Sequence, residues 1–479
     1  MSRHIANIIV KDEVNVRIKG LDPDLIDEAQ ERLTFFVPGH NHMPSYKLGR
    51  WDGKIRLMTK TGTTYLNLLE YIMPLIEDGG YDVVFEDNRS DWSEVTDAIT
   101  EIKPDYFGDI DFKGEPLLLR EYQVDAVNVA INNGSGVLEL ATGSGKTLIA
   151  AVISKIYSEY GKVIIIVPTT DLILQTQHTF KQVGIETGIW YGEIKEQKQV
   201  TVATWQSLDK YPELFFDVSC VICDECHLSK AKTINEIMTG PAANVPFRFG
   251  CTGTLPKEEL FRLQIEASIG KPIFVLRTWQ LQQQGVLADT NIYQITLNDL
   301  ANEEYAKRVE KFPFGDWADE LTWLFSCKPR MEYIANLISD IRNNSGNTLI
   351  LVPYRKHGKY LQELIPNSMS LDGRDKNRLE KYEKFNNTDD NILICTYGIA
   401  STGIDIPRIF NLVTLEPGKK FEKVMQTIGR GLRKADDKHR LNVYDVCSNN
   451  SMSRNHATKR RKLYKEAKQE LEIIEVEYM

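Results

Sequence analysis

The sequence lacks the features that mark an exported or membrane-bound chain. No stretch approaches the roughly 18 consecutive apolar residues needed to span a bilayer, and Asp12 and Glu13 stand where a signal peptide needs an apolar run. Its seven cysteines are odd in number and scattered, which argues against a disulfide framework and favours free thiols. We therefore expect a cytoplasmic protein with no membrane partner.

The chain also lacks an excess of positive charge. Its formal net charge is −9, whereas proteins that coat nucleic acid non-specifically are usually basic. Any nucleic-acid site must then be a local basic track. The length of 479 residues suggests about three domains, at roughly 150 residues per domain.

One segment differs in composition from its surroundings and divides the chain. Residues 86–111 hold nine Asp or Glu, which predicts an acidic linker that is solvated or forms a weakly packed helix. Residues 1–85, before it, predict a small α+β domain. Its strands fall within residues 5–19, a helix begins at Asp22-Pro23, and residues 65–76 predict a second helix.

Beyond residue 111 short apolar runs alternate with helical stretches. The clearest runs are Val163–Val167, Val218–Ile222, Leu349–Val352 and Ile392–Cys395. Continuous apolar strands belong to parallel sheets that are covered on both faces. We therefore expect an α/β fold with two tandem parallel-sheet lobes, at 112–275 and 276–446, followed by a basic C-terminal tail at 447–479.

A glycine-rich segment in the first lobe has the setting of a phosphate loop. It follows an apolar strand, precedes a helical stretch, and comprises Thr142, Gly143, Ser144, Gly145, Lys146 and Thr147. Glycines let backbone N–H groups converge on phosphate oxygens at a helix N-terminus. Lys146 would reach the β- and γ-phosphates, and Thr147 would bind Mg²⁺. The strict pattern has glycine where this chain has Leu140, so a plain glycine-rich turn is the alternative.

An acidic pair ends a second apolar strand. Asp224 and Glu225 lie 78 residues after Lys146, where Asp224 would hold Mg²⁺ through water and Glu225 would activate the attacking water. The alternative is a strand end with solvated acids. A rival interpretation uses the same stretch: Cys220, Cys223, Cys226 and His227 have the spacing of metal ligands or of a haem attachment string.

Further boxes follow in a fixed order, and together they resemble the superfamily 2 helicases over about residues 115–446. The boxes are Arg120–Gln123, Val167–Thr170, Thr204–Ser207, Thr252–Thr254, Thr402–Pro407 and Gln426–Arg433. The resemblance implies two RecA-like lobes that hydrolyse ATP with Mg²⁺ and act on a nucleic-acid strand.

The same resemblance implies a role for single residues. Nucleotide binding would involve Arg120, Gln123, Gly403, Asp405 and Gln426. Contacts to the strand would come from Pro168, Thr169, Thr204, Gln206, Thr252, Thr254 and Thr402. Arg430 and Arg433 lie one helical turn apart and would act as arginine fingers.

The sequence Asp224-Glu225-Cys226-His227 separates the chain from the DEAD-box RNA helicases. Within the superfamily it resembles a bacteriophage group of recombination and repair helicases, which implies action on DNA forks, Holliday junctions, D-loops and R-loops. Two alternatives stay open: an RNA helicase, and a strand-annealing or branch-binding protein that uses ATP as a switch. A restriction motor subunit is a further alternative, but the sequence shows no nuclease box.

Two basic segments lie outside these boxes. Residues 45–60 hold five Lys or Arg against Asp52 alone, and we expect Lys47, Arg50, Trp51, Lys54 and Arg56 to bind nucleic acid. The equal alternative is a solvated hairpin with Trp51 in a small core, where Phe35 and Phe36 are also expected. In residues 454–468 a basic helix either contacts phosphates or is a charged surface helix.

Overall fold

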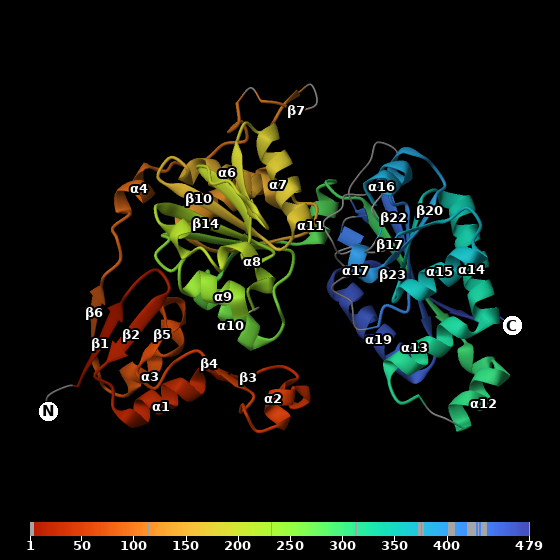
Figure 1. Ribbon diagram of the computed structural model, residues 1–479, viewed down its shortest axis with the longest axis horizontal. Helices are drawn as coiled ribbons and strands as arrows, with labels where there is room; N and C mark the ends of the chain where they lie inside the picture. The colour runs from red at the N-terminus through yellow and green to blue at the C-terminus, as the bar shows by residue number, and fades with distance from the viewer. Residues whose placement is uncertain are drawn as a thin grey trace. The chain divides into compact units, whose positions relative to one another are not determined.

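The computed structural model describes residues 4–108, 110–112, 115–230, 232–311, 314–371, 375, 378–400, 408–418, 428–429, 431–432 and 438–478. The chain divides into two compact units (Figure 1). The first comprises residues 1–141 and 145–276 and holds the small domain and lobe 1, and the second comprises residues 277–479 together with the short segment 142–144 and holds lobe 2.

The small domain is a four-stranded sheet with helices on it. The strand order is β5 (Thr63–Tyr65), β2 (Asn15–Lys19), β1 (Ile5–Val10) and β6 (Asp82–Asp87). Strands β1 and β2 alternate buried and exposed residues, as expected for a sheet with one buried face. Helix α1 (Pro23–Arg32) begins with proline at its first turn, as the Asp22-Pro23 pair predicted.

The structure corrects the prediction of one helix over residues 65–76. The segment forms a 3₁₀ helix, η2 (Leu66–Tyr71), and a separate short helix, α3 (Met73–Asp78). Pro74 explains the break, because it lacks the N–H that a continuous helix would bond to the carbonyl of Glu70.

The acidic segment is attached to lobe 1 rather than fully solvated. It contains the exposed helix α4 (Ser93–Ala98), but Ile102 and Phe107 are buried. The backbone N–H of Ile102 donates to Asn128 Oδ1 at 2.8 Å, on helix α5 (Glu121–Asn133) of lobe 1. The composition predicted the surface helix and missed these anchors.

Lobe 1 is an eight-stranded sheet whose strands are parallel apart from one edge strand. The order is β12 (Ile194–Lys195), β11 (Thr187–Tyr191), β13 (Val200–Thr204), β10 (Lys162–Val167), β14 (Val218–Asp224), β15 (Phe247–Thr252), β9 (Ser135–Leu140) and β16 (Pro272–Leu276). The central strands are buried along almost their whole length. Continuous apolar strands therefore predicted the parallel sheet correctly.

A buried arginine ties two helices of lobe 1 to this sheet. Arg248 on β15 donates to the carbonyl oxygens of Met238 at 2.5 Å and Ser268 at 2.7 Å. These residues lie at the ends of α9 (Lys232–Thr239) and α10 (Glu259–Ser268). A cation at helix C-termini satisfies orphan carbonyls and complements the helix dipoles.

The small domain docks on the same two helices. Leu263 and Ala267 of α10 belong to the hydrophobic core of the small domain. Asn15 Nδ2 donates to the carbonyl of Thr239 at 3.0 Å, and Asn67 Nδ2 donates to that of Glu266 at 2.9 Å. The small domain and lobe 1 therefore share a core, and an isolated lobe 1 would expose apolar surface.

Lobe 2 is a seven-stranded sheet in which every described pair is parallel. The order is β19 (Met369–Leu371), β20 (Ile392–Thr396), β18 (Thr348–Val352), β21 (Asn411–Leu415), β22 (Arg440–Ser448), β17 (Asp289–Leu297) and β23 (Glu470–Val476). One layer of its helices includes α13 (Trp317–Ser326), α14 (Lys328–Ser345) and α15 (Arg355–Leu364), which pack on the sheet through a shared core.

Residues 447–478 are an integral part of lobe 2 and not the tail that was expected over 447–479. Strand β23 pairs with β17, and helix α19 (Ser451–Glu466) buries one face against the sheet. Arg460 on that face is 2% exposed and binds Asp445 with two hydrogen bonds of 2.9 Å. Its charge is thus used internally, because a buried guanidinium needs a fixed partner. Arg454, Lys459, Lys462, Lys465 and Lys468 stay exposed.

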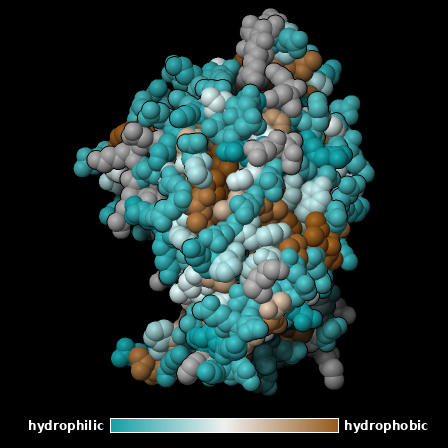
Figure 2. Space-filling model, turned by 90° about the vertical axis from the view of Figure 1, so that its right-hand side faces the viewer, coloured by the Kyte–Doolittle hydropathy of each residue, from teal (hydrophilic) through white to brown (hydrophobic). Residues whose placement is uncertain are grey.

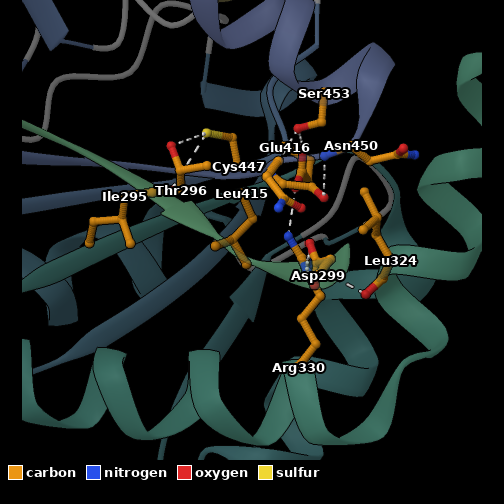
Figure 3. A network of polar contacts seen from close by, with 12 residues as sticks. Ile295, Thr296, Asp299, Leu324, Arg330, Leu415, Glu416, Cys447, Asn450 and Ser453 are labelled. Atoms are coloured by element: carbon orange, nitrogen blue, oxygen red, sulfur yellow. Dashed lines mark hydrogen bonds and ion pairs between the residues drawn. The ribbon is translucent and has the colours of Figure 1, made fainter. Parts of the chain in front are cut away.

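A second buried ion network holds the centre of lobe 2 (Figure 3). Arg330 is fully buried, and its guanidinium donates to Asp299 Oδ2 at 3.1 Å and to Glu416 Oε1 at 2.6 Å. Ser453 Oγ donates to Glu416 Oε2 at 2.6 Å. The network joins α14, the end of β21 and the start of α19, which are far apart in the sequence.

The outer surface is predominantly hydrophilic on the face shown in Figure 2, with short strips of hydrophobic side chains. Among the described residues, no helix has the length and apolar character required to cross a membrane.

Replacing Arg330 with Met should lower the free energy of unfolding of the lobe by about 3–5 kcal/mol, because two buried carboxylates would lose their cation. Urea unfolding followed by circular dichroism measures this. Lys328→Met on the same helix is the control, since Lys328 pairs with Glu332 at the exposed surface at 3.6 Å. Equal stability of the two variants would contradict the importance of the network.

Candidate nucleotide and nucleic-acid site

Five parallel strands bring the separate boxes of lobe 1 to one edge of the sheet. The carboxyl ends of β13, β10, β14, β15 and β9 are neighbours in that order. Thr204 is in register with Val167, and Asp224 is in register with Cys251. Ligands of open α/β sheets bind at this edge, so the expected nucleotide and strand segments lie side by side.

The glycine-rich segment lies between β9 and helix α6 (Lys146–Tyr157). Gly143 and Gly145 have φ values of 87° and 85°, in the left-handed region that favours glycine. Lys146 Nζ donates to the carbonyl of Leu140 at 3.4 Å. Leu140 itself is a fully buried strand residue, which is why the sheet accepts leucine where the strict pattern has glycine.

Gln123 lies against this segment. A Cβ atom added to Gly145 would come within 2.5 Å of Gln123 Nε2. The Gln123 side-chain oxygen accepts a hydrogen bond of 2.9 Å from the backbone N–H of Arg120, which begins α5. Gln123 is therefore held beside the glycine-rich segment.

The acidic pair is held at the end of β14. The Glu225 backbone N–H donates to Asp224 Oδ1 at 2.9 Å. Burial and the neighbouring Glu225 carboxylate raise the pKa of Asp224 to about 6, and Lys146 opposes the shift. Glu225 has a φ of 50°, a backbone conformation that is unfavourable for a side chain with a Cβ. Such strain is concentrated at functional sites.

His227 links the acidic pair to the box Thr252–Thr254. The sequence had suggested His227 only as a metal or haem ligand, so this role was not predicted. His227 Nδ1 lies 3.3 Å from Glu225 Oε2 and 2.9 Å from Thr252 Oγ1. Thr252 Oγ1 in turn bonds the carbonyl of Thr254 at 3.1 Å. The signal available in the sequence was the position of His227 at the end of the box Asp224-Glu225-Cys226-His227.

The metal and haem interpretation of the cysteines finds no support among the described residues. Cys220, Cys223 and Cys226 are buried and form no disulfide, and the described part of the chain contains no group of three or more His, Cys, Asp or Glu residues that could hold a metal ion. Burial raises the pKa of the Cys220 and Cys226 thiols. They behave as small hydrophobic residues of the sheet and its following turn.

Three of the residues expected to contact the strand have structural hydrogen bonds. The Thr169 hydroxyl accepts from the N–H of Leu172 and caps α7 (Thr170–Gln182). Thr204 is buried, and its hydroxyl donates to Ser207. Thr252 is fully buried against His227, so the expectation of a direct strand contact is wrong for its side chain in this structure. It connects Glu225 with the exposed Thr254 instead.

Pro168 and Gln206 are partly or fully exposed at the same edge. Six further expected residues lie outside the described residues: Thr402, Gly403, Asp405, Gln426, Arg430 and Arg433.

The basic segment of the small domain forms a hairpin at the surface. Strands β3 (Thr34–Phe36) and β4 (Lys54–Arg56) pair as a separate two-stranded sheet, joined through η1 (His40–His42) and α2 (Pro44–Lys47). Phe36 is 53% exposed, so its expected place in the core is wrong. A two-stranded sheet outside the four-stranded core leaves one face to solvent. We call residues 34–56 the basic hairpin.

Aromatic rings stack along the basic hairpin. His40 stacks on Phe36 with ring centroids 4.6 Å apart and meets the edge of Tyr46 at 4.7 Å. The ammonium of Lys54 lies 4.8 Å from the centre of the Phe36 ring. This row of rings beside cations is the composition of surfaces that bind single strands.

The five residues expected to bind nucleic acid here differ in their surroundings. Lys47 and Arg50 are exposed. Arg56 forms an ion pair with Asp52, which lowers the pKa of that carboxyl. The Trp51 indole N–H donates to the carbonyl of Lys54 at 3.0 Å, so Trp51 holds the hairpin together.

Three family models match the chain in sequence. Residues 6–86 match "DNA helicase UvsW, N-terminal", residues 116–257 match "Type III restriction enzyme, res subunit", and residues 329–435 match "Helicase conserved C-terminal domain". The matched ranges correspond to the small domain and to the greater part of each lobe.

Named relatives agree with these matches. The ATP-dependent DNA helicase uvsW of Enterobacteria phage T4 is 27% identical over 88% of this chain and 86% of its own length. The DNA 3'-5' helicase XPB of Kineococcus radiotolerans is 24% identical over 77% of this chain and 66% of its own length.

A solved structure shows the same fold. A fragment of an HsdR subunit of a type I restriction enzyme from Vibrio vulnificus has a TM-score of 0.56 and 18% identity, over 89% of this chain and 78% of that one. Together with the glycine-rich segment, the acidic pair and the two parallel-sheet lobes, the family models and the phage relative give the chain the features of an ATP-dependent DNA helicase of superfamily 2, similar to the UvsW helicase of phage T4.

Proposed function

We propose that this protein is an ATP-dependent DNA helicase or translocase that remodels branched DNA: forks, Holliday junctions, D-loops and R-loops. Recombination, repair and replication are the processes that need this activity. The similarity to the phage helicase supports DNA as the partner, and a bacterial host's cytoplasm as the place of action. RNA enters the proposal only as the RNA strand of an R-loop.

One observation supports the proposal: the segments expected to bind the nucleotide and those expected to bind the strand follow neighbouring strands at the carboxyl edge of the lobe 1 sheet. Hydrolysis at β9 and β14 is thereby linked to movement at β10 and β13 through a rigid sheet. His227 supplies a polar connection between Glu225 and the box that contains Thr252 and Thr254.

The chemical roles follow from the residues at this edge. Lys146 would neutralise charge on the phosphates, and Glu225 would orient and deprotonate the attacking water. The Thr147 hydroxyl and the Asp224 carboxylate are hard oxygen donors that suit Mg²⁺. Burial and, after it, the adjacent Glu225 carboxylate raise the pKa of Asp224, and a bound cation would offset both effects. Mg²⁺ would supply neutralisation of phosphate charge.

Lobe 2 would complete the reaction through Arg430 and Arg433. An arginine finger contributes roughly 10³–10⁵ in rate by stabilising charge in the transition state. The roles of Gly403, Asp405, Gln426 and Thr402 in nucleotide and strand binding are part of the same proposal.

The small domain would select branched DNA through its basic hairpin. Lys47 and Arg50 are exposed beside the row formed by Phe36, His40 and Tyr46. Its shared core with α10 would transmit that contact to lobe 1, since α10 packs against the turn that follows Asp224 and Glu225. An RNA helicase or an ATP-switched annealing protein would not require this selection.

ATPase and unwinding assays on forked DNA, linear duplex and RNA test the proposed function. Forked DNA should stimulate hydrolysis most and should be unwound. ATP hydrolysis stimulated by RNA alone would favour an RNA helicase. Annealing of strands without unwinding would favour an annealing protein that uses ATP as a conformational switch.

Lys146→Ala should reduce ATP turnover by roughly 10²–10³-fold or more, because phosphate charge would lack its lysine. DNA binding, measured by fluorescence anisotropy, should change little. Glu225→Gln should lose turnover as well but keep nucleotide affinity, since only water activation is removed. Normal turnover in either variant would place the chemistry elsewhere.

His227→Ala should uncouple hydrolysis from DNA. We expect basal ATPase activity within a few-fold of the unmodified protein, with a much smaller increase on adding forked DNA, because the link between Glu225 and Thr252 is lost. His178→Ala, a change in helix α7 of the same lobe, is the control. Full stimulation of the His227 variant would show that the link has no coupling role.

Lys47→Glu with Arg50→Glu should weaken binding to forked DNA more than binding to linear duplex, and the salt dependence of binding should fall. Lys60→Glu is the matched control, because Lys60 is exposed on the same domain and lies 3.7 Å from Asp27, outside the hairpin. Point substitutions test this better than deletion of the small domain, since that deletion would expose Leu263 and Ala267 of lobe 1. Unchanged discrimination would assign branch selection to another part of the chain.

A further inference from the structure

A cavity of about 510 Å³ opens in lobe 2 and is used by none of the roles described above. It lies beyond the carboxyl ends of β18, β20 and β21, between α13 and α19. Its size falls in the roughly 300–1,000 Å³ range of small-ligand sites. The carboxyl edge of a parallel sheet is the place where such sites form.

Flat aromatic side chains from four elements line the cavity. They are Trp317, Tyr354, Tyr397 and His456. Prolines at the ends of β18 and β21, Pro353 and Pro417, add apolar surface. Surfaces of this kind accept planar rings by stacking.

The aromatic walls are held in place by their neighbours. Trp317 meets the edge of His456 with ring centroids 4.7 Å apart, and a Cβ atom added to Gly418 would come within 2.9 Å of Trp317 Nε1. The hydroxyl of Tyr397 donates to the carbonyl of Leu415 at 3.1 Å. The cavity is thus preformed, which limits the entropy lost on binding.

Among the described residues that line the cavity, Glu416 supplies the one carboxylate, and both of its oxygens already accept hydrogen bonds. Glu416 has a φ of 45°, and its two oxygens accept from Arg330 and Ser453 at 2.6 Å each (Figure 3). It therefore shapes the floor and does not attract a metal ion or a cationic ligand.

Cations lie near the mouth. Lys459 lines the cavity from the exposed side of α19, one turn beyond Asn455 on the same face. On the other side, exposed Arg355 and Lys356 directly follow Tyr354 at the start of α15. Aromatic walls with cations at the rim match a ligand that has a planar ring and flanking phosphates.

We propose that this cavity accepts one unstacked nucleobase of the single DNA strand on which the motor moves, with Trp317 and Tyr354 stacking on the base and Lys459 binding an adjacent phosphate. The inference rests on the proposed function for the identity of the strand. The base contact would add to the grip on the backbone, and it would favour single over double strands because paired bases cannot leave the helix without cost.

The test compares two oligonucleotides of equal length, oligo(dT) and a fully abasic strand with the same phosphates, by fluorescence anisotropy on the full chain. The unmodified protein should prefer oligo(dT). Tyr354→Ala should reduce that preference by roughly 5–150-fold, the range for losing one aromatic–base stack, while affinity for the abasic strand stays unchanged. Tyr354 is 42% exposed, so its loss should not disturb the core.

A second variant fills the cavity instead of removing its wall. Asn455→Trp should also abolish the preference for oligo(dT). Thr458→Trp is its matched control, because Thr458 is exposed on the same helix and does not line the cavity. Phe216→Ala, an exposed aromatic of lobe 1, controls for Tyr354→Ala.

The outcomes separate this inference from the proposed function. Equal binding of both strands by the unmodified protein overturns the base pocket and leaves the DNA helicase standing. Equal weakening of both strands in Tyr354→Ala also overturns it, since the residue would then support phosphate binding or the fold. Failure of the unmodified protein to bind either strand contradicts the proposed function, and the base pocket falls with it.

Discussion

The parallel alignment of strands in lobe 1 is the constraint on which the rest of the site depends. Parallel strands all end at the same edge, so segments that are far apart in the sequence become neighbours there. Gly145, Asp224 and Thr252 reach this edge from β9, β14 and β15. Short loops then suffice to place a cation, two carboxylates and a histidine around one site.

Helices α9 and α10 extend this edge toward the small domain. Arg248, buried on β15, satisfies carbonyls at the ends of both helices. Leu263 and Ala267 of α10 complete the hydrophobic core of the small domain. Because packed cores resist deformation, the small domain and lobe 1 are expected to move as one body. A DNA contact in the basic hairpin would therefore act on the nucleotide site and not only tether the protein.

Lobe 2 uses buried charge in a similar way. Arg330 and Arg460 have no exposed surface to offer to DNA, and each binds buried carboxylates instead. Such pairs add little net stability but are costly to break, which suits them to fixing α14 and α19 against the strand ends. The cavity between α13 and α19 is held rigid by these buried pairs. Basic composition alone would have assigned Arg460 to the nucleic-acid surface.

The sequence by itself determined the parallel sheets, the phosphate loop and the acidic pair, because continuous apolar strands and a strand–loop–helix glycine pattern are local signals. The order of the boxes along the chain indicated the resemblance to the superfamily 2 helicases. The tertiary structure decided what depends on distant partners. Thr252 is buried because its hydroxyl contacts His227. Residues expected to form a tail belong to lobe 2 because β23 pairs with β17. Phe36 is exposed because it lies on the separate two-stranded sheet. None of these can be read locally, because each is set by residues remote in the chain.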